Sequence, residues 1–157
     1  MRILQAASEV IRQEGAMALT LDAVAKKAEV SKGGLLYHFP SKDALLRGLL
    51  EHHMDNFERS LENSGLPLAE AYVKLGSCDG AQGLLLGMMA ALALNPSLLE
   101  MVRGRWQRWY AQVPQNPDVM VAMLATDGIF MADMLKLGVP KDKKRVLQRM
   151  LELAGGA

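Results

Sequence analysis

Apolar residues recur at intervals of three and four along almost the whole chain, and period-two alternation is almost absent. The first pattern is typical of amphipathic helices and the second of half-buried strands. Side chains that cap helices separate the periodic segments at Thr20, Ser31 and Ser41, and prolines suited to a first helical turn stand at Pro67, Pro96, Pro117 and Pro140. The sequence therefore predicts an all-α protein of about nine helices, near residues 2–14, 21–28, 32–39, 42–63, 67–78, 81–94, 97–113, 117–137 and 140–154.

The composition suits a folded helical protein. Half of the 157 residues are hydrophobic and 22% are charged, which excludes a chain too polar to bury a core. The net charge of +1 gives no overall field that would indicate a nucleic-acid partner. The charge is uneven, however: residues 1–47 carry seven basic and five acidic side chains, residues 48–99 two and six, and residues 100–157 nine and six. Both ends are therefore basic and the middle is acidic.

Several functional classes are not supported by the sequence. The single cysteine, Cys78, has no partner for an internal disulfide, and we expect it to be a small buried hydrophobic residue in a reducing compartment. The longest nonpolar stretch, residues 83–94, is shorter than the roughly 20 residues of a membrane span, and the N-terminus lacks a signal peptide. No catalytic, phosphate-binding or metal-ligand motif is present. We expect a soluble cytoplasmic protein that is not an enzyme and needs no membrane, cofactor or metal.

The segment between residues 21 and 39 is the most informative. Two short predicted helices are joined by only Glu29-Val30-Ser31, and this tight connection predicts a helix-turn-helix. In the second of these helices, Leu35 and Phe39 are four residues apart and can join the core. The opposite face then carries four residues, Lys32, Gly33, Leu36 and Tyr37.

This opposite face has the chemistry of a DNA-binding surface. Gly33 and Gly34 each lower helix stability by about 1 kcal/mol relative to alanine, a loss that is understandable if the backbone must approach a groove closely. Lys32 and the first-turn amides favour a phosphate, and Leu36 can contact a thymine methyl. Further donors to backbone phosphates are Tyr37, His38 and Lys42.

The string TLDAVAKKAEVSKGGLLYHFPSK at residues 20–42 closely resembles the helix-turn-helix signature of the TetR/AcrR family of bacterial repressors, and DGIFMADMLKLG at residues 127–138 resembles the penultimate helix of its compact members. The resemblance implies a three-helix DNA-binding domain at residues 1–47 and a helical ligand-binding and dimerisation domain at residues 48–157. It implies DNA contacts by Thr20, Lys32, Gly33, Gly34, Leu36, Tyr37, His38 and Lys42. Because helix one starts directly after Met1, we expect no arm contact to the minor groove.

A ligand site is predicted in the second half of the chain. The helix at 97–113 places Val102, Trp106, Trp109, Tyr110 and Val113 on one inward-pointing face. Core packing explains such a stripe more often than a binding site, and both interpretations stay open. Asp127 interrupts an apolar helix, so it has either a structural partner, such as an arginine or a helix terminus, or a role as counter-charge for a cation. The predicted ligand-binding residues are Met88, Met89, Trp106, Tyr110, Met123 and Asp127.

The last two predicted helices favour a homodimer. The helix at 117–137 is apolar nearly all round and the helix at 140–154 has one apolar side, so two copies of each can form a four-helix interface. Asp133 is expected to pair across that dimer or with a nearby lysine. The resemblance then implies a repressor that binds a palindromic double-stranded DNA operator and is released by a small apolar or aromatic effector, which can also be cationic. An efflux or detoxification gene is the expected target, and a helical dimeric interaction protein without DNA binding is the alternative.

Overall fold

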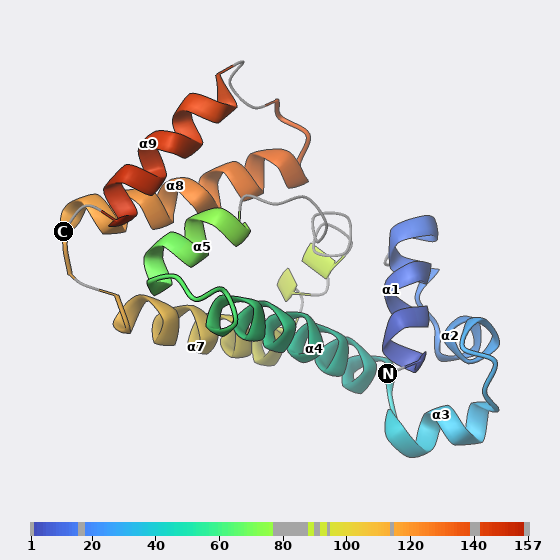
Figure 1. Cartoon of the computed structure of the whole chain (residues 1–157). Coiled ribbons are helices and arrows are strands. Elements are labelled where there is room, and N and C mark those ends of the chain that lie inside the picture. The colour runs from blue at the N-terminus through green and yellow to red at the C-terminus, as the bar shows by residue number, and fades with distance from the viewer. Residues whose placement is uncertain are drawn as a thin grey trace. The chain divides into compact units, whose positions relative to one another are not determined.

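The computed structural model describes residues 2–15, 18–76, 88–89, 92–93, 95–113, 115–138 and 142–155. Within these ranges the chain forms helices and no strand, which confirms the all-α prediction (Figure 1). The helices are α1 (Arg2–Glu14), α2 (Leu21–Lys27), α3 (Lys32–His38), α4 (Lys42–Glu62), α5 (Leu68–Gly76), α7 (Pro96–Ala111), α8 (Pro117–Met134) and α9 (Lys143–Gly155). Their limits lie within a few residues of the predicted ones. Cys78 and most of the predicted helix at 81–94 lie outside the described residues.

The chain divides into two compact units. The first comprises the described residues within 1–56 and 83–102, and the second those within 57–82 and 103–157. Two helices, α4 and α7, begin in the first unit and end in the second. None of the described helices is both long and apolar enough to cross a membrane.

Local hydrogen bonds set the helix-turn-helix of the first unit. The Thr20 hydroxyl accepts the Ala23 amide at 3.1 Å and the Ser31 hydroxyl accepts the Gly34 amide at 3.0 Å, so both predicted caps form. Between the helices, Glu29 has a φ of +53°, which turns the chain sharply. The guanidinium of Arg2 donates to the Ala28 carbonyl at 2.9 Å and ties α1 to this turn.

Helices α5, α8 and α9 pack together in the second unit (Figure 1). The contact of α5 with α8 is close, because a Cβ at Gly76 would lie 2.7 Å from the Thr126 Cγ2 atom. Between α8 and α9, the Lys143 ammonium lies 2.8 Å from an Asp133 carboxylate oxygen. Of the two pairings left open for Asp133, the structure therefore shows the one with a nearby lysine.

Candidate functional site

One face of α3 is buried and the other is exposed. Leu35 is fully buried, whereas 86% of the Tyr37 side chain is accessible to solvent. We define the α3 outer face as five residues, all of them exposed except the half-buried Leu36: Lys32, Gly33, Leu36, Tyr37 and His38. The first four of these are the residues that the helical spacing placed opposite the core, and His38, predicted as a phosphate donor, is exposed beside them. Thr20 caps α2, and Lys42 is exposed at the start of α4.

The chain's own packing does not account for Gly33. A Cβ added at this position would meet nothing within 4 Å, and its backbone does not have a positive φ. Gly34 is more restricted, since its Cβ would lie 3.1 Å from the Ser31 hydroxyl oxygen. Gly33 therefore lowers the stability of α3 without relieving any contact with the residues that the structure describes.

Lys32 forms an ion pair within the helix-turn-helix. Its ammonium lies 2.9 Å from an Asp22 carboxylate oxygen on α2, and both side chains are exposed. Exposed ion pairs of this kind contribute only about 0 to 1 kcal/mol, so an approaching phosphate can compete for the lysine. The pairing was not anticipated from the sequence because the two residues belong to different helices.

Five aromatic side chains gather in the second unit. Trp109 packs on Phe57 and Tyr72 with ring centroids 5.4 and 6.1 Å apart. Tyr110 lies 6.5 Å from Tyr72 and stacks on Trp106 at 5.7 Å with an interplanar angle of 22°. We call Phe57, Tyr72, Trp106, Trp109 and Tyr110 the aromatic cluster. It extends from a buried end, with Trp109 only 6% exposed, to Trp106, which is 37% exposed.

Asp127 on α8 is bound by two members of this cluster. The Tyr72 hydroxyl donates to its Oδ1 atom at 2.6 Å and the Tyr110 hydroxyl donates to its Oδ2 atom at 2.7 Å. Burial raises the pKa of Asp127 above its ordinary value, and the two hydrogen bonds oppose this shift. Burial and the neighbouring carboxylate both raise the pKa of each tyrosine, so the phenols stay protonated donors. The partners that the structure shows for Asp127 are thus two neutral phenols, and neither the arginine nor the helix terminus that the sequence suggests as examples.

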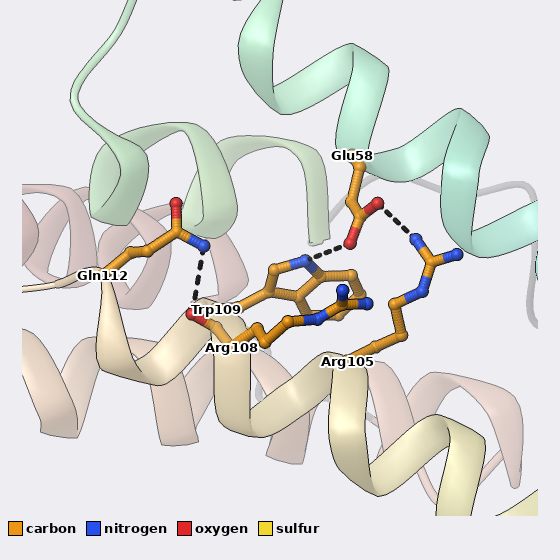
Figure 2. Close-up of polar contacts among 5 residues, drawn as sticks. All are labelled: Glu58, Arg105, Arg108, Trp109 and Gln112. Atoms are coloured by element: carbon orange, nitrogen blue, oxygen red, sulfur yellow. Dashed lines mark hydrogen bonds and ion pairs between the residues drawn. The ribbon is translucent and has the colours of Figure 1, made fainter.

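A second carboxylate lies at another edge of the cluster, and Figure 2 shows its contacts. Glu58 on α4 accepts the Trp109 indole N–H at 2.9 Å through its Oε1 atom. Its Oε2 atom accepts a hydrogen bond from the Arg105 guanidinium, with which it also forms an ion pair. The neighbouring Arg108 side chain is exposed, and its carbonyl accepts the Gln112 amide at 3.0 Å. The side chains of Glu58 and Arg105 are both largely buried.

The predicted ligand residues fall into three groups. Trp106, Tyr110 and Asp127 come together in the second unit. Met123 is fully buried on α8 of the same unit. The other two methionines lie in the first unit, where Met88 is buried and Met89 is exposed. The prediction that the whole aromatic face of α7 points inward holds for Trp109 but not for the partly exposed Trp106.

Sequence reasoning missed Phe57, Tyr72 and Glu58. Tyr72 lies 55 residues from Asp127, and Glu58 lies 51 residues from Trp109. Their local patterns are those of ordinary amphipathic helices, in which nothing distinguishes them from core or surface residues. The only local signal was the unusual position of Asp127 in an apolar helix.

Two protein families match the chain. Residues 3–49 match the family of bacterial regulatory proteins described as the tetR family, and residues 66–155 match the tetracyclin repressor-like C-terminal domain. Among curated proteins, the HTH-type transcriptional regulator UidR of Escherichia coli strain K12 is 28% identical over 111 residues, which cover 66% of this chain and 57% of UidR. The chain thus spans little more than half the length of this relative.

Solved structures share the fold. A member of the TetR family from Streptomyces coelicolor A3 superimposes with a TM-score of 0.76, at 22% identity over 97% of this chain and 95% of that one. The multidrug binding protein EbrR complexed with malachite green gives a TM-score of 0.65, at 24% identity over 97% of this chain and 95% of EbrR. The arrangement of helices is therefore shared along nearly the whole chain.

Proposed function

The chain belongs to the TetR family of bacterial regulatory proteins, and from this premise we propose that it is a ligand-responsive transcriptional repressor that binds a palindromic DNA operator as a dimer. In this proposal residues 1–47 bind DNA, and residues 48–157 bind the effector and form the dimer. The matching families and relatives are regulators and not enzymes.

The observation that carries the proposal is the exposed outer face of α3. A recognition helix needs one side anchored in its domain and the other open to the major groove. Leu35 supplies the anchor, while Tyr37 is 86% exposed. Gly33 adds support, because its missing side chain permits a close approach by an external partner and relieves no contact in the described part of the chain. Phosphate contacts by Lys32, Tyr37, His38 and Lys42 fix the register in this proposal.

Selection from a pool of random duplexes tests the proposal. We expect the protein to retain duplexes that contain an inverted repeat, with half-sites about one helical turn, roughly 34 to 36 Å, apart. Variants with Tyr37→Ala and Lys42→Ala should retain far less. If no duplex is retained at low salt, the repressor proposal fails, and the result favours the alternative, a helical dimeric interaction protein without DNA binding.

An exposed apolar stripe supports dimerisation. Val121, Leu124, Met131 and Leu135 follow one another at helical spacing in and just after α8, and each is 43 to 56% exposed. On α9, Leu151 is 37% exposed. Apolar side chains at this spacing are typical of a helix that packs on a second subunit. We therefore propose that α8 and α9 form a two-fold interface.

For the effector we propose an aromatic cation, bound at Trp106, Tyr110 and Asp127. The two phenols leave the charge of Asp127 without neutralisation, and the partly exposed Trp106 offers a ring for stacking and cation–π contact. Met123, on α8 of the same unit, completes the proposed lining. The solved structures of the multidrug binding protein EbrR hold malachite green and ethidium, which supports the same ligand class here. We propose an efflux or detoxification gene as the target.

In this proposal, DNA is released because the effector shifts the population of dimer conformations. Helix α4 begins at Lys42, four residues after the end of α3, and its last two turns carry Phe57 and Glu58, which both contact Trp109. An effector that binds more tightly to a dimer with the wrong half-site spacing lowers operator affinity, with a typical coupling of about 1 to 3 kcal/mol.

Tetraphenylphosphonium, an aromatic cation, tests the proposed effector class, with uncharged triphenylphosphine oxide as the control. The cation should release a fluorescent operator and the oxide should not. The substitution Trp106→Ala should weaken release without changing operator affinity in the absence of effector. An equal loss of both would assign Trp106 to the core instead.

A further inference from the structure

Two carboxylates flank the aromatic cluster. Asp127 is held by Tyr72 and Tyr110, and Glu58 accepts the indole N–H of Trp109. The rings of Tyr72 and Trp109 lie 6.1 Å apart, so contacts between neighbouring rings link the two carboxylates. A cation bound at Asp127 would therefore lie on the same ring cluster that Glu58 contacts.

The two carboxylates differ in their charge balance. Glu58 forms an ion pair with Arg105, and the two side chains are only 29% and 18% exposed. Opposite charges in a partly buried pair are weakly screened by salt, so Arg105 offsets most of the field of Glu58. Asp127 is bound by neutral phenols, which leave its charge in place. Among the residues that the structure describes, the cluster thus presents one negative charge that no ion pair offsets, that of Asp127.

We propose that Arg105 sets the charge preference for the effector: by neutralising Glu58, it makes the aromatic cluster bind monocations more tightly than dications. This inference rests on the proposed function, in which the cluster binds a cationic effector. A second positive group that approaches Glu58 meets the guanidinium of Arg105, and like charges at close range repel. Without this guanidinium, Glu58 becomes a second anionic contact.

Ethidium and propidium form a matched pair of probes. They share the same aromatic ring system, and propidium adds a quaternary ammonium group, so their affinity ratio isolates the effect of the second charge. We would measure both dissociation constants on the full chain without DNA, by dye fluorescence anisotropy. The wild-type protein should bind ethidium more tightly than propidium.

The substitution Arg105→Gln should raise the affinity for propidium relative to ethidium about tenfold, which corresponds to roughly 1.4 kcal/mol. Glutamine keeps an N–H donor for Glu58 but removes the positive charge. Arg108→Gln is the matched control, since Arg108 lies exposed on the same helix, and it should leave the ratio unchanged. Arg105→Lys should preserve the wild-type ratio, and the double substitution Arg105→Gln with Glu58→Gln should return to it.

The outcomes separate this inference from the proposed function. If the wild-type protein binds neither dye, the cationic effector and the role of Arg105 both fail. If it binds ethidium and a folded Arg105→Gln variant shows the wild-type ratio, only the role of Arg105 is overturned. A separate variant guards against misfolding: Glu58→Gln leaves the guanidinium charge uncompensated and should weaken propidium binding more than ethidium binding. Equal weakening of both dyes would contradict the inference.

Discussion

Replacing Asp127 by asparagine removes one negative charge while it keeps the size of the side chain and a carbonyl acceptor. In the wild-type protein the carboxylate accepts hydrogen bonds from Tyr72 at 2.6 Å and Tyr110 at 2.7 Å. Hydrogen bonds to charged groups contribute about 1.5 to 3 kcal/mol each and neutral ones about 0.5 to 1.5 kcal/mol, so the substitution loses about 2 kcal/mol. Relief of carboxylate desolvation offsets a similar amount. We therefore expect the free energy of unfolding to change by no more than ~1 kcal/mol.

Asp127→Leu provides the contrast. It removes both acceptor oxygens, and Tyr72 is only 3% exposed, so its hydroxyl would be left buried without this partner. This substitution should cost about 2 kcal/mol more than Asp127→Asn, measured by urea unfolding with circular dichroism at neutral pH. Asp127→Asn should nevertheless weaken ethidium binding about tenfold, since an attraction worth roughly 1.4 kcal/mol is lost. Equal destabilisation by both substitutions, with ethidium binding retained in the asparagine variant, would refute a ligand-directed charge.

The pH dependence gives an independent check on Asp127. Burial raises its pKa in the folded state, so the folded protein takes up this proton more readily than the unfolded chain does. As the pH falls from neutral through the raised pKa, the stability of the wild-type protein should increase relative to that of Asp127→Asn. The comparison uses urea unfolding of both proteins across this range. A relative decrease on acidification would show that hydrogen bonding, and not burial, dominates the carboxylate.

Three further substitutions probe the helix-turn-helix and the proposed dimer interface. Gly33→Ala should raise the unfolding free energy by about 1 kcal/mol and still weaken operator binding in an anisotropy assay; unchanged affinity would contradict close approach to DNA. Glu29→Gly should stabilise the protein by about 0.5 to 1 kcal/mol in urea unfolding, because glycine adopts a φ of +53° without the penalty of a Cβ atom. A loss of stability would show that the ion pair of Glu29 with Arg2 matters more. Leu124→Glu should convert dimers to monomers in analytical ultracentrifugation, and a persistent dimer would place the interface elsewhere.

Local signals made the helices and the orientation of α3 predictable. The caps at Thr20, Ser31 and Ser41 act on amides three residues away, so the sequence alone shows where those helices begin. The spacing of Leu35 from its neighbours likewise placed one face of α3 in the core and exposed Tyr37. Such features depend on a few consecutive residues and survive any arrangement of the remaining chain.

The aromatic cluster was predicted only in part, because its contacts join distant helices. Helical spacing grouped Trp106 with Trp109, but it did not show which edge of α7 other helices cover, and Trp106 is 37% exposed. The position of Asp127 in an apolar helix predicted a partner without identifying it. Asp127 pairs with Tyr72 on α5, and Glu58 pairs with Arg105 on α7. Both pairs join residues about 50 positions apart, and local periodicity carries no information on such contacts.

The salt dependence of operator binding tests most directly whether the α3 outer face and the start of α4 contact DNA. Each neutralised phosphate contributes about 0.9 to the slope of log affinity against log salt concentration. Lys42→Ala should therefore reduce the slope by about one unit per protomer, whereas Lys144→Ala, an exposed lysine on α9, should leave it unchanged. A flat slope for the wild-type protein, or equal slopes for the wild type and Lys42→Ala, would contradict the assignment of this surface to DNA.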